Sequence, residues 1–168
     1  QVKALFPTTA NVRVLNNSWG GPNTSQALQD EVSKTQAADM LFVVAAGNDA
    51  VTTDLVQDYP SGYDFPNIVA VAATDSTDSL AYFSNWGTTK VHLGAPGLSI
   101  MSTLLNGTYA LESGTSMAAP MVSGAAALVL SACTLPTSPL RANLLGNVDP
   151  LPSLAGKTTR SEEHTSEF

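Results

Sequence analysis

Three segments of the chain are apolar almost throughout, and they predict the strands and the helix at the buried centre of the fold. Residues 40–46 end at Gly47-Asn48, and residues 68–73 form a second run of the same kind. A strand that is apolar on both faces is buried on both faces, as in a parallel sheet covered by helices. The third segment, 116–131, carries Ala, Leu and Val on nearly every side, which predicts a central helix buried all round.

Weaker patterns predict the elements around this centre. Residues 12–16 favour a short strand, and a helix is expected to follow with Asn23 or Thr24 as its cap. Residues 49–67 are polar and rich in Tyr, Asp and Pro, which predicts a long surface loop. The remaining predicted elements are short strands at 81–84, 91–93, 100–102 and 108–111, and an amphipathic helix at 138–145.

The order of these elements predicts the fold class. Strand, helix and strand in succession form a βαβ unit, so we expect an α/β fold with an open, mostly parallel sheet flanked by helices. Residues 1–156 are assigned to this one domain. The tail 157–168 is polar and differs in composition from the rest, so we interpret it as disordered or artefactual and exclude it from the fold.

Composition and charge exclude several classes of function. The 168 residues include 14 acidic and 7 basic side chains, for a net charge of −7. No Lys/Arg cluster is present to neutralise phosphates, so no nucleic-acid partner is expected. No uninterrupted apolar run approaches the roughly 18 residues of a membrane helix, so no membrane partner is expected either. The single cysteine, Cys133, excludes an internal disulfide, and the oligomeric state stays open.

Two polar positions beside the apolar segments are candidates for chemistry. Ser116 follows Gly114-Thr115 where a strand is expected to lead into the helix, and the free N–H groups of a helix N-terminus favour a negative oxygen nearby. Asn48 follows a buried strand, at the edge where open α/β sheets bind ligands, and its amide could donate to a developing oxyanion. Each also has a purely structural interpretation, as a helix cap and as a Gly-Asn turn.

Five blocks of sequence occur in an order that resembles a known family. They are Asn17-Ser18-Trp19-Gly20-Gly21, Ala45-Ala46-Gly47-Asn48, the pair Tyr82-Phe83-Ser84-Asn85-Trp86-Gly87 and Gly94-Ala95-Pro96-Gly97, and Gly114-Thr115-Ser116-Met117-Ala118-Ala119-Pro120. This series closely resembles the subtilisin-like serine peptidases, or subtilases, from about residue 12 to about residue 156.

The resemblance implies a serine endopeptidase that acts on polypeptides and is extracellular or exported. It implies Ser116 as the nucleophile and Asn48 as the side-chain donor of the oxyanion hole, beside the backbone N–H of Ser116. Two strands would wall the pocket for a substrate side chain, and the small residues on one wall would leave room for a sizeable apolar group. Extended substrate would pair with the strand edge near 18–20. The implied substrate contacts are Ser18, Trp19, Gly20, Ala45, Ala46 and Gly47.

The base that a serine nucleophile needs is not found in the sequence. In the subtilases an Asp and then a His precede the serine, the His in a His-Gly-Thr-His-like block, and no such block occurs here. His92 lies in a predicted strand, and His164 lies in the polar tail. We therefore expect a subtilisin-like sheet that is incomplete on its N-terminal side, in a fragment that is inactive alone.

Two other functions stay open. Gly-Thr-Ser-Met-Ala is similar to the nucleophile elbow of α/β-hydrolases. The catalytic residues of those enzymes occur in the order Ser, Asp or Glu, His, and here Ser116, Asp149 and His164 occur in that order. The same groove could instead belong to a non-catalytic peptide-binding or structural module.

No cofactor is required for this chemistry, and no metal ligands are assigned. Calcium as a structural ion is nevertheless an expectation, because oxygen ligands suit calcium and four aspartates fall in one loop. They are Asp49, Asp54, Asp58 and Asp64, and they do not have the spacing of an EF-hand.

Overall fold

The predicted alternation of strands and helices is present in the computed structural model, which describes residues 11–159. The elements in chain order are β1 (Val14–Asn17), α2 (Gln26–Ala37), β2 (Leu41–Ala45), β3 (Ile68–Thr74), β4 (Leu93–Pro96), β5 (Ile100–Leu104), the 3-10 helix η1 (Leu105–Gly107), β6 (Thr108–Glu112), α3 (Thr115–Ala132), α4 (Thr137–Gly146) and the 3-10 helix η2 (Pro152–Leu154).

A parallel sheet of four strands, in the order β1-β2-β3-β4, forms the centre of the described chain. Its register pairs Leu15 with Phe42, and Val43 with Val69. Every residue of β2 and β3 is buried, as expected of strands that are apolar on both faces. The predicted fold class, an open and mostly parallel sheet flanked by helices, is confirmed.

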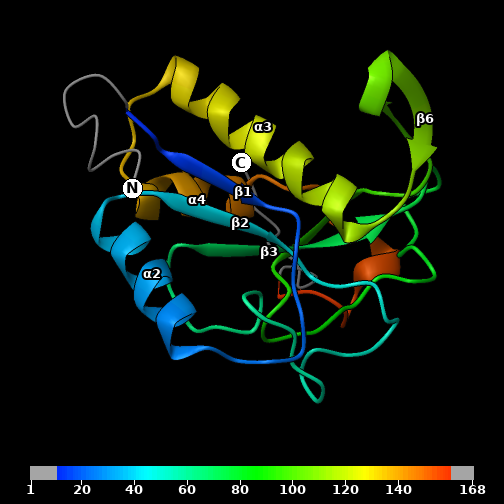
Figure 1. Ribbon diagram of the computed structural model, residues 1–168, viewed down its shortest axis with the longest axis horizontal. Coiled ribbons are helices and arrows are strands. Elements are labelled where there is room, and N and C mark those ends of the chain that lie inside the picture. Colours follow the sequence, from blue (N-terminus) through cyan, green and yellow to red (C-terminus); the bar gives the residue numbers. More distant parts are fainter. Residues whose placement is uncertain (1–10, 160–168) are drawn as a thin grey trace.

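Helices cover both faces of this sheet, with α2 and α3 on opposite sides (Figure 1). On one face, Val43 and Val71 belong to a core that also includes Leu140 of α4 and residues of α3. On the other face, Val44 packs with Val32 of α2. Neighbouring strand residues therefore serve different cores, because side chains alternate across a sheet.

The long helix α3 is buried on one side only. Ala118, Val122 and Ala126 are buried, whereas Leu128 is 73% exposed and Met121 is 44% exposed. The expectation of a helix buried all round is therefore wrong, because a helix on a sheet buries one stripe.

The helix α3 also bears on the expectation that no apolar segment is long enough to cross a membrane. With 18 residues and a mean hydropathy of 1.4, α3 meets the length and composition of a membrane span. The core helix of a globular domain meets the same criteria.

The start of α2 differs from the prediction. Ser25 is the N-cap, and its side chain accepts a hydrogen bond from the Leu28 N–H at 3.4 Å. The expected caps, Asn23 and Thr24, lie just before it. All three residue types cap helices well, so local preference alone could not choose among them.

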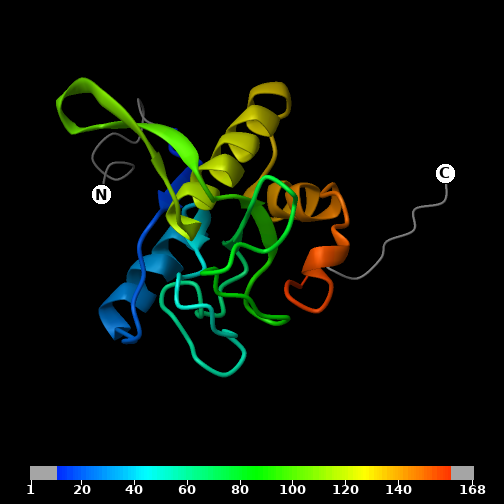
Figure 2. The ribbon, with the colours of Figure 1, turned by 90° about the vertical axis from the view of Figure 1, so that its right-hand side faces the viewer.

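The segment after β3 is less regular than predicted. Residues 81–84 form a turn, closed by a bond from the Ser84 N–H to the Ala81 carbonyl, so the predicted strand is absent there. The strand predicted at 91–93 is β4, which begins later. The last two predicted strands are β5 and β6, an antiparallel pair that projects from the body of the molecule (Figure 2).

The last described residues pack against the domain. The Gly87 N–H donates to the Lys157 carbonyl, and the Thr159 N–H donates to the Val91 carbonyl. Residues 157–159 therefore belong to the folded unit and not to the predicted tail. The rest of that tail lies outside the described residues.

Candidate active site

Ser116 is held at the start of α3 by the end of β1. Gly114 is the N-cap of the helix, Thr115 is its first residue and Ser116 is its second. Ser116 Oγ donates to the Ser18 carbonyl at 3.1 Å, and Ser18 Oγ donates to the Ser116 carbonyl at 2.7 Å. Since Ser18 directly follows β1, these bonds tie the helix to the carboxyl edge of the sheet. The Ser116 N–H belongs to the first turn of α3, whose N–H groups have no acceptor within the helix.

Asn48 lies beside this helix start with its amide in a fixed orientation. Asn48 Oδ1 accepts from the Thr115 N–H at 2.8 Å and from Thr115 Oγ1 at 3.0 Å. A backbone N–H can only donate, so the amide oxygen and not the nitrogen must face Thr115. Asn48 Nδ2 therefore points elsewhere, and it lies 3.7 Å from the position that a Cβ on Gly114 would occupy. A hydrogen-bond donor is thus available next to Ser116.

The turn from β2 to Asn48 requires glycine at position 47. Gly47 has φ of +106°, a conformation that residues with a side chain rarely adopt. A Cβ there would lie 2.2 Å from Asn85 Nδ2 and 2.6 Å from Asp58 Oδ2. The Gly47 N–H donates to Thr115 Oγ1 at 3.1 Å, which completes the connection between β2 and α3.

Asn85 supports the same turn, although the sequence alone assigned it no role. Its side chain is 1% exposed. Asn85 Oδ1 accepts from the N–H groups of Asp49 and Val51, at 2.9 and 3.2 Å, and Nδ2 donates to the Ala46 carbonyl at 3.2 Å. It therefore holds the segment that contains Asn48 at both ends. The signal that could have indicated it was its position inside one of the five blocks of sequence that carry the family resemblance.

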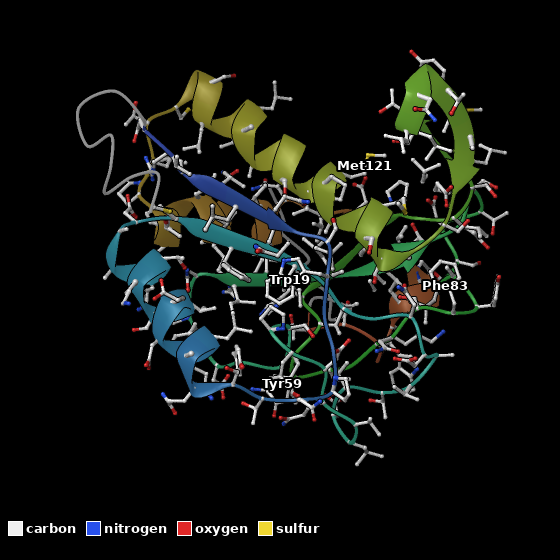
Figure 3. All side chains as sticks on the ribbon, in the orientation of Figure 1. Trp19, Tyr59, Phe83 and Met121 are labelled. Carbon is white, nitrogen blue, oxygen red and sulfur yellow. The ribbon has the colours of Figure 1, made fainter. Side chains whose placement is uncertain are left out.

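A cleft of about 520 Å³ is formed by the segments after β1 and β2 and by the start of α3. Trp19, labelled in Figure 3, is 47% exposed and is one of the residues that line it. Six predicted site residues line the cleft, namely Trp19, Gly20, Ala45, Gly47, Asn48 and Ser116. The other lining residues are Gly21, Pro22, Asp49, Val51, Val56, Gln57, Asp58, Asn85 and Thr115.

Ser18 and Ala46, also predicted to contact substrate, are not among the residues that line the cleft. Ser18 affects the site through its two hydrogen bonds with Ser116. Ala46 is completely buried in a small core with Ala72 and Val91. Its position therefore gives no support to a direct contact of its side chain with substrate.

His92 lies apart from this cleft. Its Nδ1 accepts from the Ala70 N–H at 2.9 Å, and the ring lines a separate cavity. Burial, together with the positive charges of Arg141 and Lys90, lowers the pKa of His92 to about 3. Residues 11–159 contain no other histidine, so the described part of the chain offers Ser116 no histidine base.

The residues of the α/β-hydrolase alternative are not brought together in the described chain. Asp149 lines a depression with Val148 and Leu151 that does not include Ser116. His164 lies outside the described residues. Residues 11–159 therefore give that triad no support.

Two of the four aspartates of the long loop have separate partners. Asp54 accepts hydrogen bonds from Thr88 and Thr89, and Asp64 pairs with Lys90 at 2.8 Å. Across the part of the chain that the structure describes, no group of three or more His, Cys, Asp or Glu side chains is placed to hold a metal ion. These aspartates thus do not form a calcium cage, and a structural calcium ion stays a prediction.

The fold and the cleft define a class of protein. It is an α/β protein with a serine at a helix N-terminus and an amide donor beside it, at the carboxyl ends of parallel strands. The sequence model of the subtilase family matches residues 2–146. The chain belongs to the subtilase family.

The relatives that the chain matches are longer than the chain itself. It is 43% identical over 122 residues to subtilisin amylosacchariticus of Bacillus subtilis subsp. amylosacchariticus, and this match covers 72% of the chain and 31% of that protein. It is 36% identical over 137 residues to subtilisin-like protease 2 of Plasmodium falciparum, which covers 79% of this chain and 10% of that protein. A solved structure described as proteases from Pseudoalteromonas arctica matches with a TM-score of 0.79 and 27% identity, over 87% of this chain and 47% of that one. The chain thus matches less than half of each.

Proposed function

We propose that this chain carries the nucleophile, the oxyanion hole and the substrate cleft of a serine endopeptidase. Ser116 is the nucleophile, and Asn48 Nδ2 and the Ser116 N–H are the donors that hold the oxyanion. The segments after β1 and β2 contact a substrate side chain. The names of the relatives, subtilisin and subtilisin-like protease, support this reaction class. By analogy with the family, the substrate is a polypeptide and the protein is exported.

The reaction begins when Ser116 Oγ attacks the carbonyl carbon of a peptide bond. The new bond forms as the π electrons move onto the carbonyl oxygen and the hydroxyl proton passes to a general base. Asn48 and the start of α3 stabilise the oxyanion, and one such donor is worth about 10²–10³ in turnover. Collapse then expels the amine, which takes the proton from the base, and leaves an acyl ester on Ser116. Water hydrolyses the ester by the same steps.

The fixed orientation of the Asn48 amide carries the proposal. Thr115 directs two donors at Asn48 Oδ1, which leaves Nδ2 for a ligand beside Ser116. A donor held in place before charge develops needs no reorganisation in the transition state, so it favours that state over the substrate.

Residues 11–159 place no histidine beside Ser116 to act as the general base. In the structure the Ser116 hydroxyl donates to the Ser18 carbonyl, a neutral acceptor that does not take up the proton. For a subtilisin, loss of either the serine or the base lowers turnover by about 2 × 10⁶. We therefore expect the chain alone to be inactive and to cleave peptides only when a base is supplied.

Incubation of the purified chain with an unfolded protein tests this proposal. We expect no cleavage that is sensitive to a serine-directed covalent inhibitor. Concentrated imidazole supplies a base and should start slow cleavage, which the inhibitor and Ser116→Ala both abolish. Ser131→Ala, on the exposed side of the same helix, is the matched control and should have no effect.

Two results would contradict the proposal. Fast, inhibitor-sensitive cleavage without imidazole would refute the inactivity of the chain. Imidazole-dependent cleavage that survives Ser116→Ala would refute the role of Ser116. Peptide binding without cleavage in either condition would favour the second candidate, a non-catalytic peptide-binding module, which the bond between Ser116 and Ser18 also favours for the isolated chain.

A further inference from the structure

A carboxylate lies in the cleft beside Ser116. Asp58 is one of the lining residues. Its oxygens lie between the segment that follows β1 and the segment that follows β2, which form the two walls of the cleft. A Cβ added to Gly20 would be 3.1 Å from Asp58 Oδ2, and one added to Gly47 would be 2.6 Å from the same atom. Because both walls carry glycine at this level, neither wall covers the carboxylate with a side chain.

Backbone hydrogen bonds hold Asp58 in this place. Gly21, at the end of the first wall, and Tyr59 exchange two N–H to carbonyl bonds of 2.9 and 2.8 Å. Asp58 Oδ1 also accepts from the Tyr59 N–H at 2.9 Å. Trp19 and Tyr59, both labelled in Figure 3, belong to the two segments that this pairing joins. The carboxylate is thus a fixed part of the cleft.

No described cation neutralises this carboxylate. No Lys or Arg lines the cleft in residues 11–159, and Asp49 adds a second acid to it. Burial raises the pKa of Asp58, the N–H groups of Tyr59 and Gly21 lower it, and the charge of Asp49 raises it again. These are the effects expected for a charge that is partly desolvated and has no counter-charge. The ion pairs Arg13–Asp39, Lys34–Glu31 and Lys90–Asp64 lie outside this cleft.

We propose that this cleft binds a Lys or Arg side chain, on the substrate residue whose carbonyl Ser116 attacks. The inference rests on the proposed function and specifies its substrate class. A Lys or Arg side chain has an apolar stem, which suits walls of Ala and Gly, and a charged end that would pair with Asp58. A large apolar side chain would instead remove water from the carboxylate without replacing its hydrogen bonds, so the cleft also selects against it. This differs from the apolar group expected from the small wall residues alone.

Binding of benzamidine, a cation, and of benzamide, a neutral molecule of the same shape, tests this inference without catalysis. We expect the chain to bind benzamidine about tenfold more tightly than benzamide, measured by NMR titration. Asp58→Asn keeps the shape of the side chain and its acceptor for the Tyr59 N–H, and it should abolish the difference. Asp64→Asn makes the same change of charge outside the cleft and should leave the difference intact.

Equal affinity for the two molecules, binding of neither, or a difference that survives Asp58→Asn would overturn the inference. These outcomes are separate from those of the cleavage experiment, because binding needs no base. Cleavage at Ser116 without a preference for the cation would overturn this inference alone. A preference for the cation in a chain that imidazole never activates would support the cationic cleft and overturn the peptidase proposal.

Discussion

Replacing Asn85 by Ala is the sharpest test of how the candidate site is supported. The substitution removes three hydrogen bonds, to the backbone of Ala46, Asp49 and Val51. Each neutral hydrogen bond contributes about 1 kcal/mol net, so the free energy of unfolding should fall by about 3 kcal/mol. Ala46 is completely buried whereas Asp49 is exposed to water, so the carbonyl of Ala46 should account for the largest share. The loss should also free the segment that contains Asn48.

Urea unfolding followed by circular dichroism measures this loss. A change of 1 kcal/mol corresponds to about 2–4 °C in Tm for a chain of this size, so the thermal midpoint should fall by about 6–12 °C. Asn143→Ala, at an exposed position of α4, is the matched control and should change stability by less than about 0.5 kcal/mol. A loss below about 1 kcal/mol for Asn85→Ala, or equal losses in the two variants, would refute the support that we assign to Asn85.

Two further predictions concern acid stability. Burial is the largest of the effects that lower the pKa of His92 to about 3. Between pH 6.5 and 3 the unfolded chain therefore binds one more proton at this residue than the folded chain does. As the pH decreases through this range, the free energy of unfolding falls by up to about 1.4 kcal/mol per pH unit. His92→Asn keeps an acceptor for the Ala70 N–H without titrating, so its urea midpoint should change less between pH 6.5 and 4; equal slopes would contradict this. Burial raises the pKa of Asp54, but hydrogen bonds from Thr89 and Thr88 outweigh it and lower the pKa to about 2. The stability that Asp54 adds is therefore present above about pH 4 and lost toward pH 2. Asp54→Asn should lower the thermal midpoint at pH 7 but hardly at pH 2, and an equal effect at both would count against this account.

The central strands could be predicted because their burial is visible in the sequence. Apart from Thr74 at the end of β3, the segments at β2 and β3 have no polar position on either face, which is typical of strands in a parallel sheet covered on both sides. The helix α3 shows the limit of the same reasoning. Its composition predicts burial all round, but which side meets the sheet depends on the neighbours that the fold supplies, and Leu128 faces away from them.

The site was predictable where its residues adjoin those apolar segments. Asn48 ends the run that forms β2, and Ser116 begins the run that forms α3. Asp58 and Asn85 lie in irregular segments instead, where no periodicity indicates which way a side chain points. In the sequence, Asp58 is only one of four loop aspartates that raise the expectation of calcium, and the pairing of Gly21 with Tyr59 is what places it in the cleft.

By itself the sequence determined the class of the fold, the family and the two residues best suited to attack and to oxyanion binding, because these depend on local runs and on motif order. Tertiary structure alone decided how the Asn48 amide is turned, which loop acid enters the cleft and that His92 lies away from Ser116. Those properties depend on contacts between residues far apart in the sequence, from the bond of Ala70 to His92 across 22 positions to the bond from Thr115 to Asn48 across 67 positions. Such contacts arise only when the chain folds, so no local pattern records them.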